Sequence, residues 1–425
     1  MRIIVQKFGG TSVATSKARA RVTEWVVKAK REGYSPVVVV SAMGRSGDPY
    51  ATDTLINLAK EAYHDTRPRE LDLLASCGEI ISSVVVTNTL RAAGLDAIVM
   101  TGGQAGIITN SNFGNAEIIR VDPSPVLRHL NEGKVVVVAG FQGVTEDGDV
   151  TTLGRGGSDT TAAALGVALN ADVIEIYTDV DGIKTADPRL VPDARTINTI
   201  TYEEILQMAN EGAKVIHPKA VEIAMMRNIP LRIKCTFSEA PGTLITYTFE
   251  GPPKWPAVPG NRTVTGITHM PNVAQIKVYT PLKAHGADRN QEEETQKSLR
   301  KRGETDLLMF KKLAEAGISL DMISFTPEVK MFIIQESLVD GALAIISEFG
   351  LEARVTKGCS KVSVVGSGMR GVPGVMANVV EALERAGVPI IQTSDSHLTI
   401  SCLVSKEHTE KAVRALHDQF GLAHV

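Results

Sequence analysis

The first 235 residues of this 425-residue chain alternate apolar strand patterns with helical patterns. The strand segments are apolar without strict alternation, which is typical of parallel strands covered on both faces. They are Ile3–Val5, Ser35–Ala42, Gly133–Phe141 and Ala171–Asp179, and the helical segments include Lys17–Arg31, Arg69–Arg91 and Asp159–Leu169. This alternation predicts an α/β domain with a doubly wound, mostly parallel sheet. Ligands of such sheets usually lie at the carboxyl ends of the strands.

The pattern changes from about Ser238, where the proline-rich stretch EGPPKWPAVPGNR predicts a linker or crossover. Beyond it, the order strand, helix, strand, strand, helix occurs twice, which indicates an internal duplication of a small α+β unit. The first copy comprises Ala274–Val278, Asp306–Ala316, Ser319–Phe325, Val329–Ile334 and Val339–Phe349. The second comprises Lys361–Val365, Gly374–Ala386, Pro389–Thr393, Thr399–Val404 and His408–Phe420.

These changes predict a catalytic domain over residues 1–237, a linker over 238–263, and repeat domains over 264–357 and 358–425. The first repeat domain carries an insert at residues 284–304 that is dense in both charge signs. Such a composition is typical of a solvated loop or a frayed helix.

Composition excludes several classes of protein. The net charge is -3 and there is no long basic run, so nucleic acid is not expected as a partner. The N-terminus has only three apolar residues after Arg2, so no signal peptide is expected, and no apolar run approaches the roughly 20 residues of a membrane helix. The four cysteines lack CxxC spacing, which fits a reducing cytoplasm rather than a zinc site or a disulfide framework.

The stretch KFGGTS, which follows the first strand, has the residues of an anion site. Bare glycine N–H groups and a following helix suit an anion, and Lys7 supplies a full positive charge. Phosphate is the expected ligand, although the same residues can also form an ordinary strand–helix turn without a ligand. No GxxxxGK[ST] or GxGxxG motif follows the first strand.

A second glycine-rich loop, TTLGRGGSDTTAAALG, precedes an alanine-rich helix. Arg155 can make a bidentate contact to a carboxylate or phosphate. Ser158 or Asp159 can cap the helix, and a capping role alone would also explain the aspartate. Two such loops in one α/β domain favour a ligand site.

Two further stretches carry polar groups. YTDVDGIKTADPR follows a buried strand and can line a nucleotide, or can be a long hairpin-like loop. In GAKVIHPKAVE, Lys214 comes before a helix whose first turn holds Pro218, a favoured position for proline. His217 is interpreted as a capping or structural residue rather than a catalytic one.

Taken together, KFGGTS, VVVSAMG, SCGE, AGFQG, LGRGGSDTTAAALG, YTDVDGIKTADPR and GAKVIHP resemble the aspartokinases of the amino-acid kinase superfamily. The C-terminal repeats resemble the paired ACT regulatory domains of these enzymes, and the resemblance runs from Ile3 to about Phe420. No dehydrogenase domain follows, so the chain resembles the monofunctional type, and VVVSAMGRSGDPYATD and SDSH resemble the branch regulated by lysine or diaminopimelate.

The resemblance implies the transfer of phosphate from ATP, as its Mg²⁺ complex, to L-aspartate, giving 4-phospho-L-aspartate and ADP. This reaction is the first step towards diaminopimelate and lysine, threonine and methionine. It implies that Lys7 contacts the transferring phosphoryl group and that Asp159 orients Lys7. Arg155 would hold the α-carboxylate of the substrate and Glu79 its α-ammonium. No general base is expected, because the β-carboxylate of the substrate is itself the nucleophile.

The resemblance also implies the remaining contacts. Lys214 is expected in catalysis or nucleotide binding, and no metal ligand of the protein itself is expected. The nucleotide is expected to contact Lys7, Phe8, Gly9, Gly10, Ser41, Ser158, Thr178, Asp179, Lys184, Arg189 and Lys214. The substrate is expected to contact Thr52, Glu79, Arg155, Gly156, Gly157 and Ser158. Lys184 departs from the tyrosine that is frequent in relatives.

The repeats imply an amino-acid effector, diaminopimelate or lysine, and a homodimer through the ACT domains. The effector positions are Ser319, Leu320, Asp321, Met376, Ala377, Ile390, Ile391, His397 and Leu398. His397 stands in DSHL where many relatives have TSEI. A histidine suits a second carboxylate better than an acid does, so diaminopimelate is favoured over lysine.

Two alternatives remain for the function. A sister kinase for glutamate or acetylglutamate would share the fold, but such relatives generally lack the SCGE segment and the paired repeats. A catalytically dead amino-acid sensor would use only the repeats. Lys7, Glu79, Arg155 and Asp159 are all present, which speaks against a dead enzyme.

Overall fold

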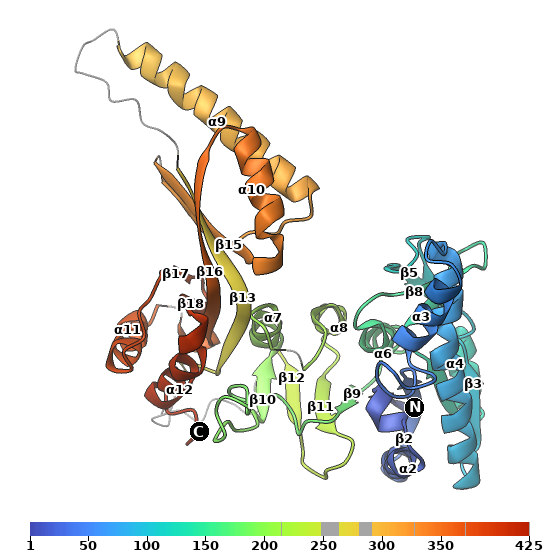
Figure 1. Cartoon of the computed structure of the whole chain (residues 1–425). Coiled ribbons are helices and arrows are strands. Elements are labelled where there is room, and N and C mark those ends of the chain that lie inside the picture. The colour runs from blue at the N-terminus through green and yellow to red at the C-terminus, as the bar shows by residue number, and fades with distance from the viewer. Residues whose placement is uncertain (214, 248–262, 280–290, 327, 370, 425) are drawn as a thin grey trace. The chain divides into compact units, whose positions relative to one another are not determined.

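A computed structural model of the chain describes residues 1–213, 215–247, 263–279, 291–326, 328–369 and 371–424, with only the backbone described for 291–302. The chain forms two compact units (Figure 1). The first comprises residues 1–185 and 195–259, and the second comprises 186–194 and 260–425. Each unit has its own main sheet and its own helices.

The first unit is built on an eight-stranded sheet of order β10-β12-β11-β9-β1-β2-β6-β3. Its strands are β1 (Arg2–Phe8), β2 (Tyr34–Val40), β3 (Ala97–Met100), β6 (Val135–Ala139), β9 (Val173–Thr178), β10 (Thr199–Thr201), β11 (Leu231–Cys235) and β12 (Thr243–Thr246). All neighbouring pairs are parallel except β11 with β12. The predicted doubly wound, mostly parallel sheet is therefore confirmed, and β1 lies at its centre.

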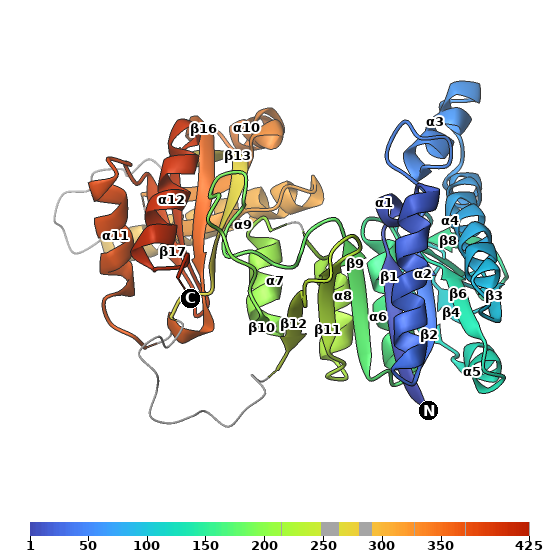
Figure 2. The same cartoon turned by 90° about the horizontal axis from the view of Figure 1, so that it is seen from below.

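Helices pack on both faces of this sheet. They are α1 (Gly10–Val13), α2 (Ser16–Arg31), α3 (Thr52–Ala62), α4 (Pro68–Ala92), α5 (Ser124–Asn131), α6 (Gly157–Ala168), α7 (Tyr202–Asn210) and α8 (Pro218–Met225). Helix α2 lies over β1 and β2 (Figure 2), where Val22, Trp25 and Val26 pack against buried strand residues such as Phe8 and Val38.

A small second sheet of order β5-β4-β7-β8 flanks α4. Its strands are β4 (Ile107–Thr109), β5 (Ile118–Val121), β7 (Gln142–Val144) and β8 (Val150–Thr152). Asp72 of α4 anchors this sheet, because its carboxylate accepts hydrogen bonds from Gly114 N at 2.9 Å and from Thr152 N and Oγ1 at 2.8 and 2.7 Å. The small sheet follows directly from the end of β6, so it lies near the carboxyl ends of the main strands.

Among the described residues, α4 is the helix that is long and apolar enough, by length and composition, to cross a membrane. Half of its apolar window is buried within the unit. The helix also carries the buried carboxyl groups of Asp72 and Glu79, each of which accepts a hydrogen bond from a backbone N–H of the same unit. We therefore interpret α4 as a core helix.

The second unit has a six-stranded sheet of order β14-β15-β13-β16-β18-β17. Its strands are β13 (Gly266–Tyr279), β14 (Asp321–Phe325), β15 (Val329–Gln335), β16 (Glu352–Val365), β17 (Gln392–Asp395) and β18 (Thr399–Ser405), and its helices are α9 (Gln291–Glu315), α10 (Val339–Glu348), α11 (Val375–Arg385) and α12 (Thr409–Gln419). The predicted duplication is visible, since each half contributes three strands and two helices.

The two repeats are joined more closely than the predicted boundaries suggest. β13 and β16 are each 14 residues long and pair antiparallel along their whole length, so the repeats share one sheet and β16 crosses the predicted boundary at residue 357. The strand predicted at Pro389–Thr393 is observed at Gln392–Asp395. The sheet of the first unit likewise continues through β12, beyond the predicted domain end at residue 237.

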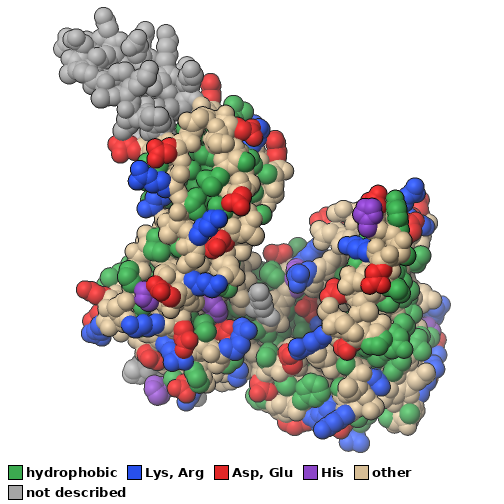
Figure 3. Space-filling view, in the orientation of Figure 1, with side chains coloured by type: hydrophobic (Ala, Val, Ile, Leu, Met, Phe, Trp, Pro, Cys, Tyr) green, Lys and Arg blue, Asp and Glu red, His purple; other side chains and the backbone are tan. Residues whose placement is uncertain are grey.

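The predicted polar insert lies partly outside the described residues. From Gln291 onward the backbone is helical and continues into the predicted helix as α9, so the helix begins earlier than the sequence pattern indicates. On the face seen in Figure 3, basic and acidic side chains are interspersed without a large patch of one sign.

Candidate active site

The carboxyl ends of the central strands open into a cavity of about 500 Å³ in the first unit. β1 lies between β2, which the chain reaches through α2, and β9, which it reaches through α6. Ligands of open α/β sheets usually bind at such a point. The cavity is lined by Lys7, Gly10, Ser41, Ala42, Gly44, Arg45, Ser46, Ala51, Thr52, Asp53, Ile56, Glu79, Phe141, Gly154, Arg155, Gly156, Gly157, Ser158 and Asp159.

Lys7 and Asp159 form an ion pair at the edge of this cavity. Lys7 Nζ lies 2.7 Å from Asp159 Oδ1, and both side chains are largely buried. Lys7 is near the end of β1, whereas Asp159 is in the first turn of α6. The pair therefore fixes the lysine ammonium at the strand end, as the sequence predicted for an orienting carboxylate.

The glycine pair after β1 is required by close backbone contacts. A Cβ on Gly10 would lie 2.5 Å from Gly44 O and 2.6 Å from Ala42 O. Gly9 N–H donates to Tyr177 O at 3.4 Å, so the prediction that Gly9 N–H is open to a phosphate is wrong. The ring of Phe8 is also unavailable to a nucleotide, because it is fully buried and stacks on the ring of Tyr177, with 4.5 Å between the ring centres.

The loop before α6 brings Arg155 and Ser158 to the cavity. Gly156 is the N-cap of α6 and has φ 72, so the helix begins before Ser158 and the alternative capping role of Ser158 or Asp159 is wrong. Arg155 is exposed and has no ion pair or hydrogen bond with any described side chain. Its guanidinium is therefore available to an anion in the cavity.

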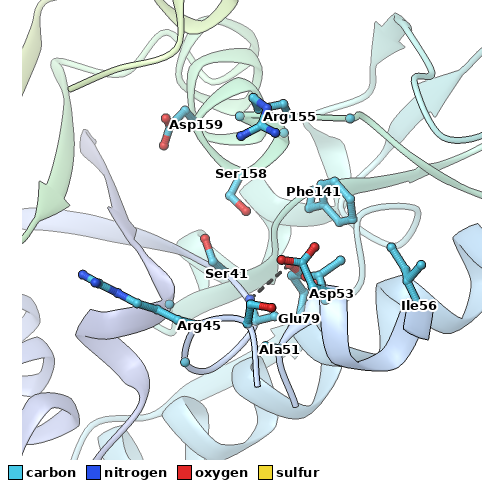
Figure 4. Close-up of a pocket in the computed structure, with 18 of the residues that line it drawn as sticks. Ser41, Arg45, Ala51, Asp53, Ile56, Glu79, Phe141, Arg155, Ser158 and Asp159 are labelled. Atoms are coloured by element: carbon cyan, nitrogen blue, oxygen red, sulfur yellow. Dashed lines mark hydrogen bonds between the residues drawn. The ribbon is translucent and has the colours of Figure 1, made fainter. Parts of the chain in front are cut away.

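Glu79 lies on the opposite wall, on α4, and is 3% exposed. Its Oε1 accepts a hydrogen bond from Ala42 N at 3.1 Å, drawn as a dashed line in Figure 4. Its buried Oε2 has no hydrogen-bond partner among the described residues. Burial raises the pKa of Glu79 to about 8, which is expected for a carboxyl group that lacks its cation.

Figure 4 shows how these groups face one another. Arg155, Ser158 and Asp159 come from α6 and its preceding loop, and Ser41, Arg45, Asp53 and Glu79 come from the other side. A guanidinium and an unpaired carboxyl group thus border the same cavity beside a fixed ammonium. This arrangement suits a zwitterionic amino acid close to a phosphate.

Replacement of Glu79 by glutamine is expected to change how stability depends on pH. Because the pKa of Glu79 in the folded state is about 8, above the usual value of about 4.3, the folded state holds the proton more tightly. This tighter binding of the proton adds to the free energy of unfolding. The contribution is fully present below about pH 4 and is lost as the pH rises to about 8. Glu79→Gln should abolish this loss, so its free energy of unfolding at pH 9 should exceed that of the wild type by up to about 5 kcal/mol. Urea unfolding of both proteins at pH 5 and pH 9 measures this difference.

Glu61→Gln is the matched control for this measurement, because Glu61 is exposed on α3. Glu61→Gln should show the same change in free energy of unfolding between pH 5 and pH 9 as the wild type. Equal pH dependence of Glu79→Gln and the wild type would show that Glu79 is charged in the folded protein.

The predicted nucleotide residues after β9 lie outside this cavity. Thr178 Oγ1 donates to Asp179 Oδ1 at 3.2 Å, and Asp179 pairs with Arg45 at 2.9 Å. Lys184 Nζ donates to Thr196 Oγ1 at 2.8 Å. Arg189 belongs to the second unit, where its guanidinium binds the carboxylate of Asp187.

His217 confirms its predicted capping role, because its Nδ1 accepts from Lys219 N at 3.4 Å at the start of α8, where Pro218 is the first helical residue. Its ring also packs on the loop before α6, since a Cβ on Gly156 would lie 2.3 Å from its Cγ. Lys214 lies outside the described residues.

Sequence reasoning gave no role to Arg45, Asp53, Ile56 and Phe141, which also line the cavity. Phe141 has φ 68, an uncommon conformation for a non-glycine residue, and its N–H donates to Thr161 Oγ1 at 3.0 Å. The stretch AGFQG is one of the family motifs, but nothing in it marks the phenylalanine as a wall of the cavity.

In the second unit the predicted effector residues are only partly brought together. Ser319 and Leu320 directly precede β14 and Ile390 and Ile391 directly precede β17, and these two strands contact each other. Asp321 does not offer a free carboxylate as predicted, because its Oδ2 lies 2.6 Å from Lys361 Nζ.

The remaining effector residues lie elsewhere in the second unit. Met376 and Ala377 are exposed in the first turn of α11, while His397 and Leu398 lie in the turn between β17 and β18. In the described part of the chain, no hydrogen bond or ion pair joins them to Asp321.

Residues 2–235 match the model of the amino acid kinase family, and residues 354–418 match an ACT domain. The chain is 46% identical to aspartokinase 1 of Bacillus subtilis over 423 residues, which covers all of both chains. The chain belongs to the aspartokinases. These are ATP-dependent kinases with the amino acid kinase fold.

Further relatives agree with this assignment. An aspartokinase of Mycolicibacterium smegmatis is 40% identical, with 99% of this chain and 97% of the relative covered. Escherichia coli aspartokinase III in complex with aspartate and ADP has a TM-score of 0.74 at 28% identity, over 98% of this chain and 99% of that chain. The same enzyme in complex with lysine and aspartate has a TM-score of 0.72 at 27% identity, over the same shares of both chains.

Proposed function

We propose that this chain transfers the γ-phosphoryl group of ATP to the β-carboxylate of L-aspartate, giving 4-phospho-L-aspartate and ADP. The observation that carries the proposal is the placement of Arg155 and Glu79 on opposite walls of the cavity that holds the Lys7–Asp159 pair. The complex of the E. coli relative with aspartate and ADP supports the choice of both ligands.

Each group of the cavity has a role in this reaction. Arg155 binds the α-carboxylate of the substrate and Glu79 binds its α-ammonium, with Gly156, Gly157, Thr52 and Ser158 lining the same pocket. Binding of the ammonium restores a charged partner to Glu79 and favours its ionised form. The substrate is thereby held with its β-carboxylate towards Lys7.

Catalysis then rests on position and charge. Lys7 stabilises the negative charge on the transferring phosphoryl group, which is most of what phosphoryl transfer requires. Asp159 holds the Lys7 ammonium in place. The attacking β-carboxylate is already an anion, so no side chain has to remove a proton.

The nucleotide enters beside Gly10, Ser41 and the loop after β9, where Thr178, Asp179 and Lys184 lie. The described residues contain no cluster of three or more metal-ligating side chains. Mg²⁺ would fit this site as an ion carried mainly by the phosphates of the nucleotide, with the Asp159 carboxylate beside it. It would supply positive charge that neutralises the phosphates.

The coupled release of ADP tests the substrate. L-Aspartate should support ATP-dependent ADP release, whereas L-glutamate, which is one methylene longer, should be turned over at least tenfold less efficiently. Equal or faster release with glutamate would favour the sister kinase. Release with neither amino acid would favour the sensor.

We further propose that the chain acts in the cytoplasm, in the first step towards diaminopimelate, lysine, threonine and methionine. The product, an acyl phosphate, is short-lived in water, so a reductase or a transferase must consume it. An end-product amino acid acting on the second unit would then match supply to demand, as an allosteric effector does by binding one state of an enzyme more tightly.

The effector is expected to be diaminopimelate rather than lysine, because His397 stands in place of an acid. Titration of activity with lysine, threonine and meso-diaminopimelate should show the lowest half-inhibitory concentration for diaminopimelate. His397→Glu should shift the preference towards lysine, because an acid suits a lone ammonium. Stronger inhibition of the wild type by lysine, or an unchanged preference in the variant, would contradict this assignment.

The second unit is proposed to form a homodimer through the edge strand β14. Ile323 and Phe325 on this strand are 55% and 57% exposed, and Leu307 and Leu308 on α9 are 55% and 54% exposed. An exposed apolar edge strand is a site for pairing with another chain. Phe325→Asp should therefore give a monomer by light scattering at micromolar concentration, where the wild type is a dimer.

Ile119→Asp is the control for this variant, because Ile119 is equally apolar and 60% exposed but lies on β5 of the first unit. It should leave the dimer intact. A monomeric wild type, or a dimeric Phe325→Asp, would rule out this interface.

A further inference from the structure

On the sheet face that α2 covers, the part formed by β9 and β11 carries polar residues where a buried α/β sheet is normally apolar. In β9 and β11 every second residue is apolar and buried, namely Ile174, Ile176, Leu231 and Ile233. The alternating positions carry Glu175 on β9, between Val173 and Tyr177, and Arg232 and Lys234 on β11. Such alternation is typical of strands with one face open, so the polar face is expected to border a cavity.

A cavity of about 330 Å³ lies on this face, beside α2, and shares no residue with the candidate active site. Strand register places Gln6 of β1 next to Glu175 of β9, and Glu175 next to Arg232 of β11. Trp25, Lys28 and other residues of α2 form the opposite wall. The volume is within the range of sites for small molecules.

Glu175 is fully satisfied inside this cavity. It accepts from Tyr177 OH at 2.6 Å, from Gln6 Nε2 at 3.1 Å and from Lys234 Nζ at 3.3 Å. Lys234 Nζ also lies 4.0 Å from the centre of the Trp25 ring. Burial lowers the pKa of Lys234.

Gln6 retains an unused acceptor. Its side chain is 1% exposed, and its Oε1 has no hydrogen-bond partner among the described residues. The amide cannot turn around, because Oε1 would then face the carboxylate of Glu175. A buried amide oxygen without a donor costs stability, so this oxygen would gain from a hydrogen bond donated by an N–H or O–H group.

Two charged groups of the cavity also lack partners. No described residue forms an ion pair or hydrogen bond with the Arg232 guanidinium or with the Glu32 carboxylate, and both line the cavity. The carboxylate of Asp172, by contrast, accepts a hydrogen bond from Ile3 N at 2.8 Å and forms an ion pair with Arg2 Nε at 3.7 Å. Lys28 also has an ion-pair partner, since its Nζ lies 3.9 Å from Glu239 Oε2.

The lining charges cancel, with Lys28, Arg232 and Lys234 against Glu32, Asp172 and Glu175. A multiply charged anion gains nothing from a neutral site, whereas a molecule with one charge of each sign can satisfy both open groups. We propose that this second cavity binds a small zwitterionic amino acid, with its carboxylate on Arg232 and its ammonium towards Glu32 and the Gln6 amide oxygen.

Trp25 provides a local probe for this site. In the full-length chain carrying Trp255→Phe, Trp25 is the sole tryptophan, and its ring lies in the cavity wall beneath Lys234. Its fluorescence is titrated with glycine, 4-aminobutyrate and 6-aminohexanoate, which place the two charges at increasing separation. At least one of the three should give a saturable change at millimolar concentration.

Two comparisons assign the change to the cavity. The tightest of the three zwitterions should bind at least tenfold better than the acid or amine of the same length. Arg232→Gln and Glu32→Gln should each weaken it at least tenfold, because each removes one charged contact. Glu32 is exposed and Arg232 is half-buried, so substitution should leave the core intact. Arg120→Gln, which changes an exposed arginine of β5, should bind as the wild type does.

No saturable change with any zwitterion, equal binding of the plain acid, or unchanged affinity in both variants would overturn the proposal. Activity with aspartate is read separately, and its result does not bear on this site.

Discussion

Lys7→Ala is expected to lower kcat about 10²–10³-fold while the protein stays folded, which is the usual effect of losing one charge contact to a transition state. The Lys7 ammonium lies at the end of β1 and is held 2.7 Å from Asp159. No other lysine lines the cavity in the described part of the chain. Steady-state kinetics with aspartate and ATP measure the loss, and circular dichroism checks the fold.

Two further variants define the role of Asp159. If Asp159 acts by orienting Lys7, then Asp159→Ala and the double variant should lose about as much as Lys7→Ala alone, because residues that act as a unit are not additive. Lys17→Ala, at an exposed position on α2, should keep wild-type activity. Activity of Lys7→Ala within about tenfold of the wild type would remove this pair from the catalytic residues.

Gly156→Ala is expected to lower kcat/KM about 10²-fold, since an error of 1 Å in positioning can cost that much. Gly156 has φ 72, and an added Cβ would lie 2.3 Å from His217 Cγ. The loop must therefore move, and Arg155 and Ser158 on either side move with it. Most of the loss should be in KM for aspartate, because Arg155 binds its carboxylate.

Two variants separate the clash from the backbone conformation. Gly148 also has a left-handed backbone conformation, with φ 86, but an added Cβ would have no atom within 4 Å. Gly148→Ala should therefore retain activity. His217→Ala combined with Gly156→Ala removes the clashing ring and should recover part of the lost kcat/KM. No recovery in the double variant would mean that the backbone conformation, and not the ring, sets the position of the loop.

Much of the fold was predictable because its signals are local. The apolar runs of β2 and β6 identify buried parallel strands, and the glycine-rich loops mark the strand ends where Lys7 and Arg155 lie. The sharing of one sheet by the two repeats was not predicted. It depends on the antiparallel register of β13 with β16, which no local pattern in either strand specifies.

The errors at the sites have similar causes. Asp321 was interpreted from its own charge, whereas its environment is set by Lys361, 40 residues away in the sequence. Gly9 and Phe8 were assigned to the nucleotide from their motif, but both contact Tyr177 of the neighbouring strand. Arg45 and Phe141 were missed because their approach to the cavity depends on how loops after two different strands fold together.

The most direct test of the proposed reaction identifies the product. When the enzyme turns over ATP and L-aspartate in the presence of hydroxylamine, an acyl phosphate is trapped as a hydroxamate, whose position is found by NMR. We expect the β-hydroxamate of L-aspartate in equal amount to ADP, and about 10²–10³-fold slower formation of it with Lys7→Ala. The α-hydroxamate, or ADP release without any hydroxamate, would contradict transfer to the β-carboxylate.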